Sequence, residues 1–249
     1  MKRSSMNALA AVVMAMGSGV GHAEEFPLPP REWPSPVADQ AVYSNVVLDR
    51  FEYQSRAGAD AQTWDLQGWV GGDYNKFWFK SEGERTSGSG VESADIQGLY
   101  ARLISPYWYL QVGVRGEPKP SPSRTQGVLA IQGIAPYWFD VAASAFLSTK
   151  GKLSARFEAE RDFLLTQRLI LQPRLETQFS ASSEPERQIG SGITNIEVGL
   201  RLRYEIRREF APYIGISWSH KPGQTGQFAR AAGEDTRSTS IVLGVRAWY

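Results

Sequence analysis

The chain has 249 residues, a formal net charge of +1 and 21% charged residues, so its charge balance gives no indication of a nucleic-acid partner. It contains no cysteine, which excludes disulfides and thiolate metal sites. The mean hydropathy of −0.33 resembles that of a soluble protein. A transmembrane β-barrel has a similar average, because its strands alternate lipid-facing apolar residues with polar residues that face the lumen.

The first 23 residues predict a secretory signal peptide. Lys2 and Arg3 precede the apolar run at residues 8–16, and small residues follow at 21–23. The run is too short to span a bilayer, and this order of charge, apolar core and cleavage site is that of a signal; an uncleaved anchor is the alternative. Cleavage removes every methionine and leaves His220 as the single histidine.

Residues 24–41 predict a proline-rich periplasmic leader that precedes a barrel over residues 42–249. Five prolines fall between residues 27 and 36, and proline denies the ladder its N–H donors and favours extended backbone. The leader is interpreted as a flexible tether, with a plug that enters the lumen as the alternative.

The rest of the chain alternates apolar and polar residues with period two, as half-buried strands do. In the final segment, Ile241, Leu243 and Val245 fall on one face and Arg246 on the other. The alternation slips near Leu99, which predicts a β-bulge there. Twelve segments share the pattern, an even number as in single-chain bacterial barrels. They comprise residues 46–55, 63–74, 77–82, 92–104, 108–115, 126–134, 137–148, 152–161, 168–180, 194–206, 209–219 and 238–249.

The connections between these segments are short and long in turn, which is typical of periplasmic turns and extracellular loops. We therefore predict an all-β fold, a closed antiparallel transmembrane β-barrel of about twelve strands in the outer membrane of a Gram-negative bacterium. A soluble β-sandwich is the alternative. The expected turns lie at 75–76, 105–106, 135–136, 165–166 and 207–208, and the expected long loops at 84–91, 116–123, 181–193 and 221–235.

Four long segments, at residues 63–84, 105–115, 164–176 and 200–218, resemble in order the copper-resistance protein B family of bacterial outer membranes. The resemblance covers roughly residues 42–249. It implies an outer-membrane barrel connected with copper tolerance, with copper ion as the metal handled and a periplasmic region that is rich in Met and His in many members. The leader of this chain departs from that pattern, because it contains neither residue.

This departure bears on copper binding. Tight copper sites use thioether, thiolate or imidazole ligands, whereas the predicted mature chain offers only His220 and oxygen ligands. His220 falls where a strand runs into a loop, so it is interpreted as a rim residue and not as a ligand. We therefore expect no tight copper site in the mature chain, only weak attraction of cations by carboxylates.

The polar positions of the strands predict an acidic lumen, because rings of carboxylates favour cation passage. Arg246 is expected to meet a carboxylate of the first strand such as Glu52. The alternative is a structural ladder in which these charges pair and fill the lumen. The carboxylates expected to hold cations weakly are Glu158, Glu160, Glu176, Glu197, Asp65 and Glu82, and the lumen bases are Arg156, Arg174, Arg201, Arg203 and Arg246.

Three functions stay open from the sequence. The first is a conduit or a weak cation-holding component in copper resistance and homeostasis. The second is a non-conducting scaffold for a periplasmic copper-binding partner, and the third is an outer-membrane hydrolase. A hydrolase needs a base beside a nucleophile, and His220 has no evident partner, so a non-enzymatic role is predicted, with outer-membrane lipid as the surrounding partner. Twelve strands lie between barrels with a filled interior and barrels with a water channel.

Overall fold

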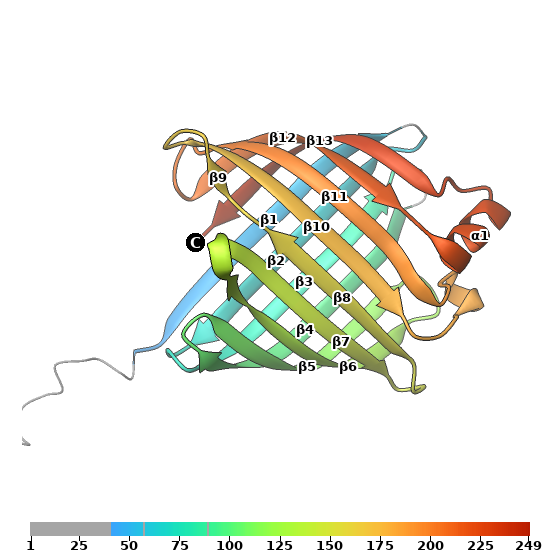
Figure 1. The fold of residues 1–249 in the computed structure, drawn as a ribbon, viewed down its shortest axis with the longest axis horizontal. Coiled ribbons are helices and arrows are strands. Elements are labelled where there is room, and N and C mark those ends of the chain that lie inside the picture. Colours follow the sequence, from blue (N-terminus) through green and yellow to red (C-terminus); the bar gives the residue numbers. More distant parts are fainter. Residues whose placement is uncertain (1–40, 57, 89) are drawn as a thin grey trace, which may run out of the picture. The chain divides into compact units, whose positions relative to one another are not determined.

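The computed structural model describes residues 41–249 except 57 and 89, so the predicted signal peptide (1–23) and all but the last residue of the predicted leader (24–41) lie outside this part. The described strands form one antiparallel sheet whose two edges pair with each other through β10 and β11, so the sheet is closed (Figure 1). The predicted all-β barrel is thereby confirmed. Among the described residues, no helix is both long enough and apolar enough to cross a membrane.

The strands follow one another around the barrel in chain order. Their bounds are β1 (Tyr43–Arg56), β2 (Ala61–Gly71), β3 (Asn75–Thr86), β4 (Gly90–Ser105), β5 (Trp108–Lys119), β6 (Arg124–Ala135), β7 (Phe139–Ser148), β8 (Leu153–Glu160), β9 (Phe163–Leu164), β10 (Leu169–Ser180), β11 (Gly192–Tyr204), β12 (Phe210–His220) and β13 (Arg237–Trp248). Three helices lie between strands, η1 (Pro136–Trp138), η2 (Pro185–Arg187) and α1 (Gly223–Ala231).

The thirteen strands occupy twelve positions in the barrel, because β8 and β9 both pair with β10. The two residues between them, Arg161 and Asp162, run opposite Pro173 and Gln172 of β10. Arg161 donates its N–H to the Pro173 carbonyl at 3.2 Å, but proline has no N–H to return to the ladder. The missing donor explains why this strand is interrupted at that level.

The last strand closes the barrel against the first. Val46 and Tyr249 exchange two backbone hydrogen bonds of 2.9 Å, and β13 pairs with β1 along its length. The side chains of Ile241 and Leu243 are 62% and 61% exposed, whereas Val242 between them is fully buried. In this segment, the predicted alternation therefore places one set of residues on the lipid face and the other set in the lumen.

The connections differ in detail from those expected. The first turn lies at 72–74, because Asn75 and Lys76 already pair within β3. The expected long loop at 84–91 is mostly strand and the one at 116–123 is half strand, because β3, β4 and β5 continue their ladders beyond the predicted ends. Two long connections, 181–191 with η2 and 221–236 with α1, lie at the end of the barrel opposite the short turns (Figure 1).

The register of β4 against β5 shifts between Ala94 and Ile96 and between Leu103 and Ser105, but not at Leu99, so the bulge predicted there is misplaced. Leu99 is 1% exposed and keeps its inward parity. Part of the lumen wall is apolar at this level, which is why the polar alternation lapses while the backbone stays regular. The inward apolar cluster consists of Trp78, Leu99, Ala101, Val128, Ala130 and Phe146, with Trp69 and Tyr109 packed against it.

We predict that Gly113→Val prevents closure of the barrel. A Cβ atom at Gly113 of β5 would lie 2.0 Å from the carbonyl oxygen of Gly98, and a neighbouring strand cannot move away without breaking the ladder. The expected result is loss of the compact, heat-modifiable band in gel electrophoresis after refolding into vesicles. Gly116→Val, in the same strand, is the control, since a Cβ atom there meets nothing within 4 Å. Equal refolding of both variants would contradict the prediction.

Candidate functional site

The six predicted carboxylates and five predicted bases all take part in ion pairs inside the barrel. Arg50, Arg156 and Arg174 lie within 4.0 Å of all six carboxylates between them. The remaining bases pair with carboxylates outside that set. These pairs are Arg201 with Glu52, Arg203 with Asp162, and Arg246 with Asp49.

Arg156 of β8 joins opposite walls of the lumen. Its Nη1 lies 2.6 Å from a carboxylate oxygen of Glu82 on β3, and its Nη2 lies 3.6 Å from Asp95 on β4. The strands β4 to β7 separate β3 from β8 around the sheet, so these contacts cross the lumen. On its own side, Arg156 is 3.7 Å from Glu158 and 3.6 Å from Glu176. One guanidinium therefore holds four carboxylates from two walls.

Arg174 of β10 organises the carboxylates of one wall. It lies opposite Glu160, while Glu176 lies opposite Glu158 in the same ladder. Its guanidinium is 2.9 Å from Glu158, 3.2 Å from Glu176 and 4.0 Å from Glu160. Because like charges that face each other across strands repel, the arginines between these glutamates allow them to be packed together.

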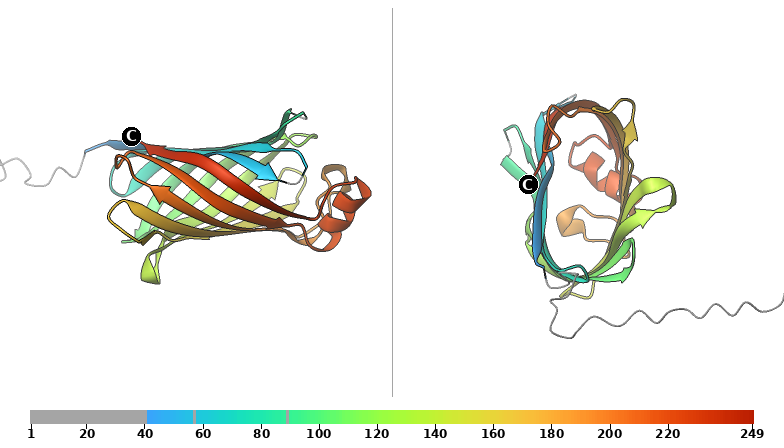
Figure 2. Two further views of the ribbon diagram at one scale, coloured as in Figure 1. Left: turned by 90° about the horizontal axis from the view of Figure 1, so that it is seen from above. Right: turned by 90° about the vertical axis from the view of Figure 1, so that its left-hand side faces the viewer.

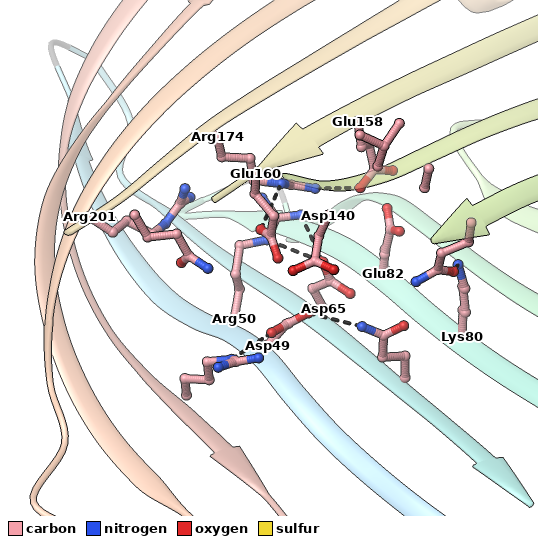
Figure 3. A pocket seen from close by; sticks show the side chains of 16 residues that line it. Asp49, Arg50, Asp65, Lys80, Glu82, Asp140, Glu158, Glu160, Arg174 and Arg201 are labelled. Carbon is pink, nitrogen blue, oxygen red and sulfur yellow. Dashed lines mark hydrogen bonds and ion pairs between the residues drawn. The ribbon is translucent and has the colours of Figure 1, made fainter. Parts of the chain in front are cut away.

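Two polar cavities lie along the lumen, and both are lined by Arg50 and Glu82. The smaller, of about 220 Å³, lies toward the short turns and is lined by Asp49, Asp140 and Glu160 among others (Figure 3). The larger, of about 750 Å³, lies toward the long connections. The ion-paired layer that contains Arg50 and Glu82 therefore lies between the two cavities.

A second buried ion pair stabilises the seam where the barrel closes. Both oxygens of Glu52 on β1 accept hydrogen bonds from Arg201 of β11, at 3.1 and 2.8 Å, and one also accepts a hydrogen bond from Tyr213 of β12 at 3.2 Å. Gly244 of β13 lies between them in register, and a Cβ there would come within 2.6 Å of the Tyr213 ring. The glycine gives these side chains room to cross β13.

Arg246 pairs with Asp49 at 2.7 Å and not with Glu52, so the expected strand is right and the expected residue is wrong. The alternation did not assign Asp49 to the lumen, because the register shifts between Leu48 and Phe51. This bulge turns two consecutive residues, Asp49 and Arg50, toward the interior. A run of two charges in an otherwise alternating strand is the one signal that could have indicated it.

The outer end of the lumen has a cluster that the sequence did not reveal. Glu117 of β5 binds three guanidiniums, Arg115 at 2.9 Å, Arg124 at 2.5 Å and Arg187 of η2 at 2.7 Å. Partial burial lowers the pKa of Arg187, and the adjacent Glu117 opposes that shift. Arg187 is separated from Glu117 by 70 residues, so no local pattern could have paired them.

The Glu117 cluster holds the connection at 181–191 over the larger cavity, and this connection in turn contacts α1. Thr225 of α1 accepts a hydrogen bond from the Gly190 N–H at 2.9 Å, and residues of both η2 and α1 line this cavity. In the end-on view of Figure 2, η2 and α1 lie within the outline of the barrel. The outer mouth is therefore partly covered by these two segments.

Comparison with known proteins gives two kinds of similarity. The family described as copper resistance protein B precursor matches residues 42–249. A copper resistance protein B homolog of Pseudomonas syringae pv. tomato is 42% identical over 213 residues, which cover 86% of this chain and 72% of the relative. Copper resistance protein B of Escherichia coli is 41% identical over the same shares.

Among solved structures, the barrel is similar to two porins. The KdgM porin aligns with a TM-score of 0.51 and 13% identity, covering 82% of this chain and 98% of that chain. The NanC porin aligns with a TM-score of 0.53 and 12% identity, covering 82% and 99%. At this identity, the similarity concerns the fold alone.

The donor atoms of the lumen do not fit a tight copper site. The predicted carboxylates are hard oxygen donors, and each faces a guanidinium that competes for the same oxygens. In residues 41–249 other than 57 and 89, no group of three or more His, Cys, Asp or Glu side chains is arranged to hold a metal ion. His220 lies at the end of β12, where its Nδ1 is 3.1 Å from the Thr236 carbonyl.

We predict that Glu52→Gln lowers the free energy of unfolding by about 3 kcal/mol, because it leaves the buried Arg201 guanidinium without its counter-charge. Urea unfolding of the barrel in lipid vesicles, followed by tryptophan fluorescence, measures the change. Glu84→Gln is the matched control. Glu84 also pairs with an arginine, Arg56 at 2.6 Å, but its side chain is 33% exposed, so a loss below about 1 kcal/mol is expected. Equal losses in the two variants would argue against a special role for the seam.

Proposed function

Because the chain belongs to the copper resistance protein B family, we propose that its outer-membrane barrel serves copper resistance as a narrow conduit for cations, with the ion pairs of Arg156 as its constriction. The family resemblance predicted from four segments is confirmed, and the barrel places the protein in the outer membrane of a Gram-negative bacterium. The route through the lumen and the identity of the ion that passes are the proposed part.

The observation that supports a conduit is the arrangement of the two cavities around one thin layer. Polar, charged side chains line the cavities on both sides, and the layer between them is held by side-chain contacts alone, of which the 2.6 Å pair between Arg156 and Glu82 crosses the lumen. Side chains can exchange partners far faster than strands can separate. Passage in this proposal requires that side chains of the layer, Arg156 first among them, move from one carboxylate to another.

In this proposal, the six predicted carboxylates attract cations without forming a resident metal site. A narrow polar cavity with low-dielectric walls focuses the field of its charges, and carboxylate rings favour cations over anions. Glu158 and Glu160 are the best placed for this role, because their side chains are 27% and 28% exposed and line the smaller cavity. Copper would be cargo here, held through weak contacts and released.

A non-conducting scaffold for a periplasmic copper-binding partner is the second candidate. It is favoured by the same pairing that neutralises the lumen, since all six predicted carboxylates have a guanidinium within 4.0 Å. Charges that only satisfy one another would make the lumen a structural ladder. The partner would then bind at the short turns or at the leader and supply the soft ligands that copper prefers.

Conductance in planar bilayers tests the conduit. We expect cation-selective current through the wild-type barrel, and a reversal potential in a salt gradient that moves toward zero in Glu158→Gln/Glu160→Gln, because two lumen charges are removed. Arg156→Gln should raise the unitary conductance severalfold, since the cross-lumen contact is lost. Arg208→Gln is the control, because this guanidinium is 77% exposed and lies at a periplasmic turn.

Two results would argue against the conduit. The first is absence of current in the wild type and in Arg156→Gln, although both insert and migrate as folded barrels. The second is an unchanged reversal potential after both glutamates are neutralised. The first result, combined with retention of a periplasmic copper-binding protein on the immobilised barrel, would favour the scaffold.

A further inference from the structure

Three aromatic side chains face the lumen near the short turns. Trp69 of β2 lies opposite Trp78 of β3 in the ladder, and Tyr109 of β5 packs with Trp69 against the apolar cluster that contains Trp78. Trp69 and Tyr109 are half-buried, so their rings border accessible space. The periplasmic end of the lumen therefore has an aromatic wall on β2, β3 and β5.

A cation already lies on this wall. The Nζ atom of Lys76 is 3.9 Å from the ring centre of Trp69 and 4.8 Å from that of Tyr109. The residues opposite Lys76 in the flanking strands are Gly71 and Ala101, and their small size leaves room for the ammonium to reach both rings. Distances below about 6 Å are those of favourable cation–π contacts.

A second ammonium continues the arrangement deeper in the lumen. Lys80 Nζ is 5.6 Å from the Trp78 ring and donates a hydrogen bond of 2.8 Å to Gln132. The Trp78 side chain is only 9% exposed, and its Nε1 has no hydrogen-bond partner among the described residues. An indole N–H usually finds a partner when it is buried, so this part of the wall is polar but unsatisfied.

These rings differ in chemistry from the carboxylates and guanidiniums that fill most of the lumen. Cysteine is absent from the chain, and methionine is absent after residue 16. The single histidine after residue 22 is His220, which lies at the end of β12 next to the long connection, away from the short turns. Soft monovalent metal ions prefer polarizable donors to carboxylate oxygen. The π faces of indole and phenol are the softest donors that the described lumen offers, and they attract cations that shed water easily.

We propose that Trp69 and Tyr109, with Trp78 beside them, form a cation–π site for a soft monovalent metal ion, in which the Lys76 ammonium is the resident competitor. The site would receive the ion at the periplasmic mouth or release it there, and this role rests on the proposed conduit. Binding of the ion does not rest on the proposed conduit, because the rings of Trp69, Tyr109 and Trp78, called the cage below, already lie together in the barrel. Lys76 keeps the affinity low, as a path that must release its ion requires.

Silver ion is the probe, because Ag⁺ has the charge and softness of Cu⁺ and does not change oxidation state in air. The purified full-length protein is titrated with silver nitrate in detergent, and tryptophan fluorescence is recorded. We expect saturable quenching in the wild type and about tenfold tighter binding in Lys76→Gln, which removes the competing charge. Trp69→Phe in the Lys76→Gln background should weaken binding by about tenfold.

The matched controls separate the site formed by Trp69, Tyr109 and Trp78 from the six other tryptophans. Trp64→Phe changes an indole of the same strand that lies near the outer end of β2 and pairs with Ser81, and it should leave the dissociation constant unchanged. Lys76→Arg keeps a cation over the rings and should not tighten binding. Sodium nitrate at the same concentrations should cause no quenching, because a hard, hydrated ion gains little from a π face.

The proposal is overturned if Lys76→Gln binds Ag⁺ no more tightly than the wild type, or if Trp69→Phe and Trp64→Phe weaken binding equally. Unsaturable quenching of equal slope in all variants means collision with exposed rings and also overturns it. Conductance of the same samples keeps the two proposals apart. A conducting barrel without this Ag⁺ pattern refutes the cage alone, and a silent barrel that shows the pattern refutes the conduit alone.

Discussion

The hydrocarbon core of a bilayer offers no partner for a backbone N–H or C=O group, so a sheet that spans it has to close on itself. In this protein, closure rests on the pairing of β1 with β13 and on the final hydrogen bonds between Val46 and Tyr249. Closure of the sheet also determines which residues fill the interior of the barrel. Once alternate residues face lipid, the other half of each strand must fill a narrow space, and most of those residues are charged or polar.

The charged interior is stabilised because its carboxylates and guanidiniums neutralise each other's charge. A buried charge without a partner costs several kcal/mol, and the arginines of β8, β10 and β11 provide partners across one or several strands. The same pairing limits what the lumen can bind. A carboxylate that a guanidinium already holds is a poor ligand for a metal ion, so electrostatic guidance of passing cations is compatible with this interior and a permanent copper centre is not.

Family membership and donor chemistry can be reconciled in this way. The chain belongs to the copper resistance protein B family, yet its described lumen holds oxygen donors, guanidiniums and one aromatic wall. Both proposals follow from treating copper as an ion that travels or is handed on. In these proposals, the aromatic wall around Trp69 offers polarizable π faces to a soft ion but no strong metal ligand. The layer around Arg156 narrows the lumen with side chains that can move.

The sequence by itself determined the features that depend on local periodicity. Alternation predicted the barrel, its twelve positions and the inward direction of residues such as Glu158 and Arg174. Alternation gave the wrong face for Asp49, because a bulge in β1 turns this residue toward the lumen. It also gave a wrong bulge at Leu99, which faces the lumen but is apolar because it packs in the inward apolar cluster. Only the tertiary structure decided which arginine forms an ion pair with which carboxylate. Arg156 meets Glu82, Arg187 meets Glu117 and Arg246 meets Asp49. These partners depend on the tilt and stagger with which distant strands come together when the sheet closes, and no short stretch of chain encodes that geometry.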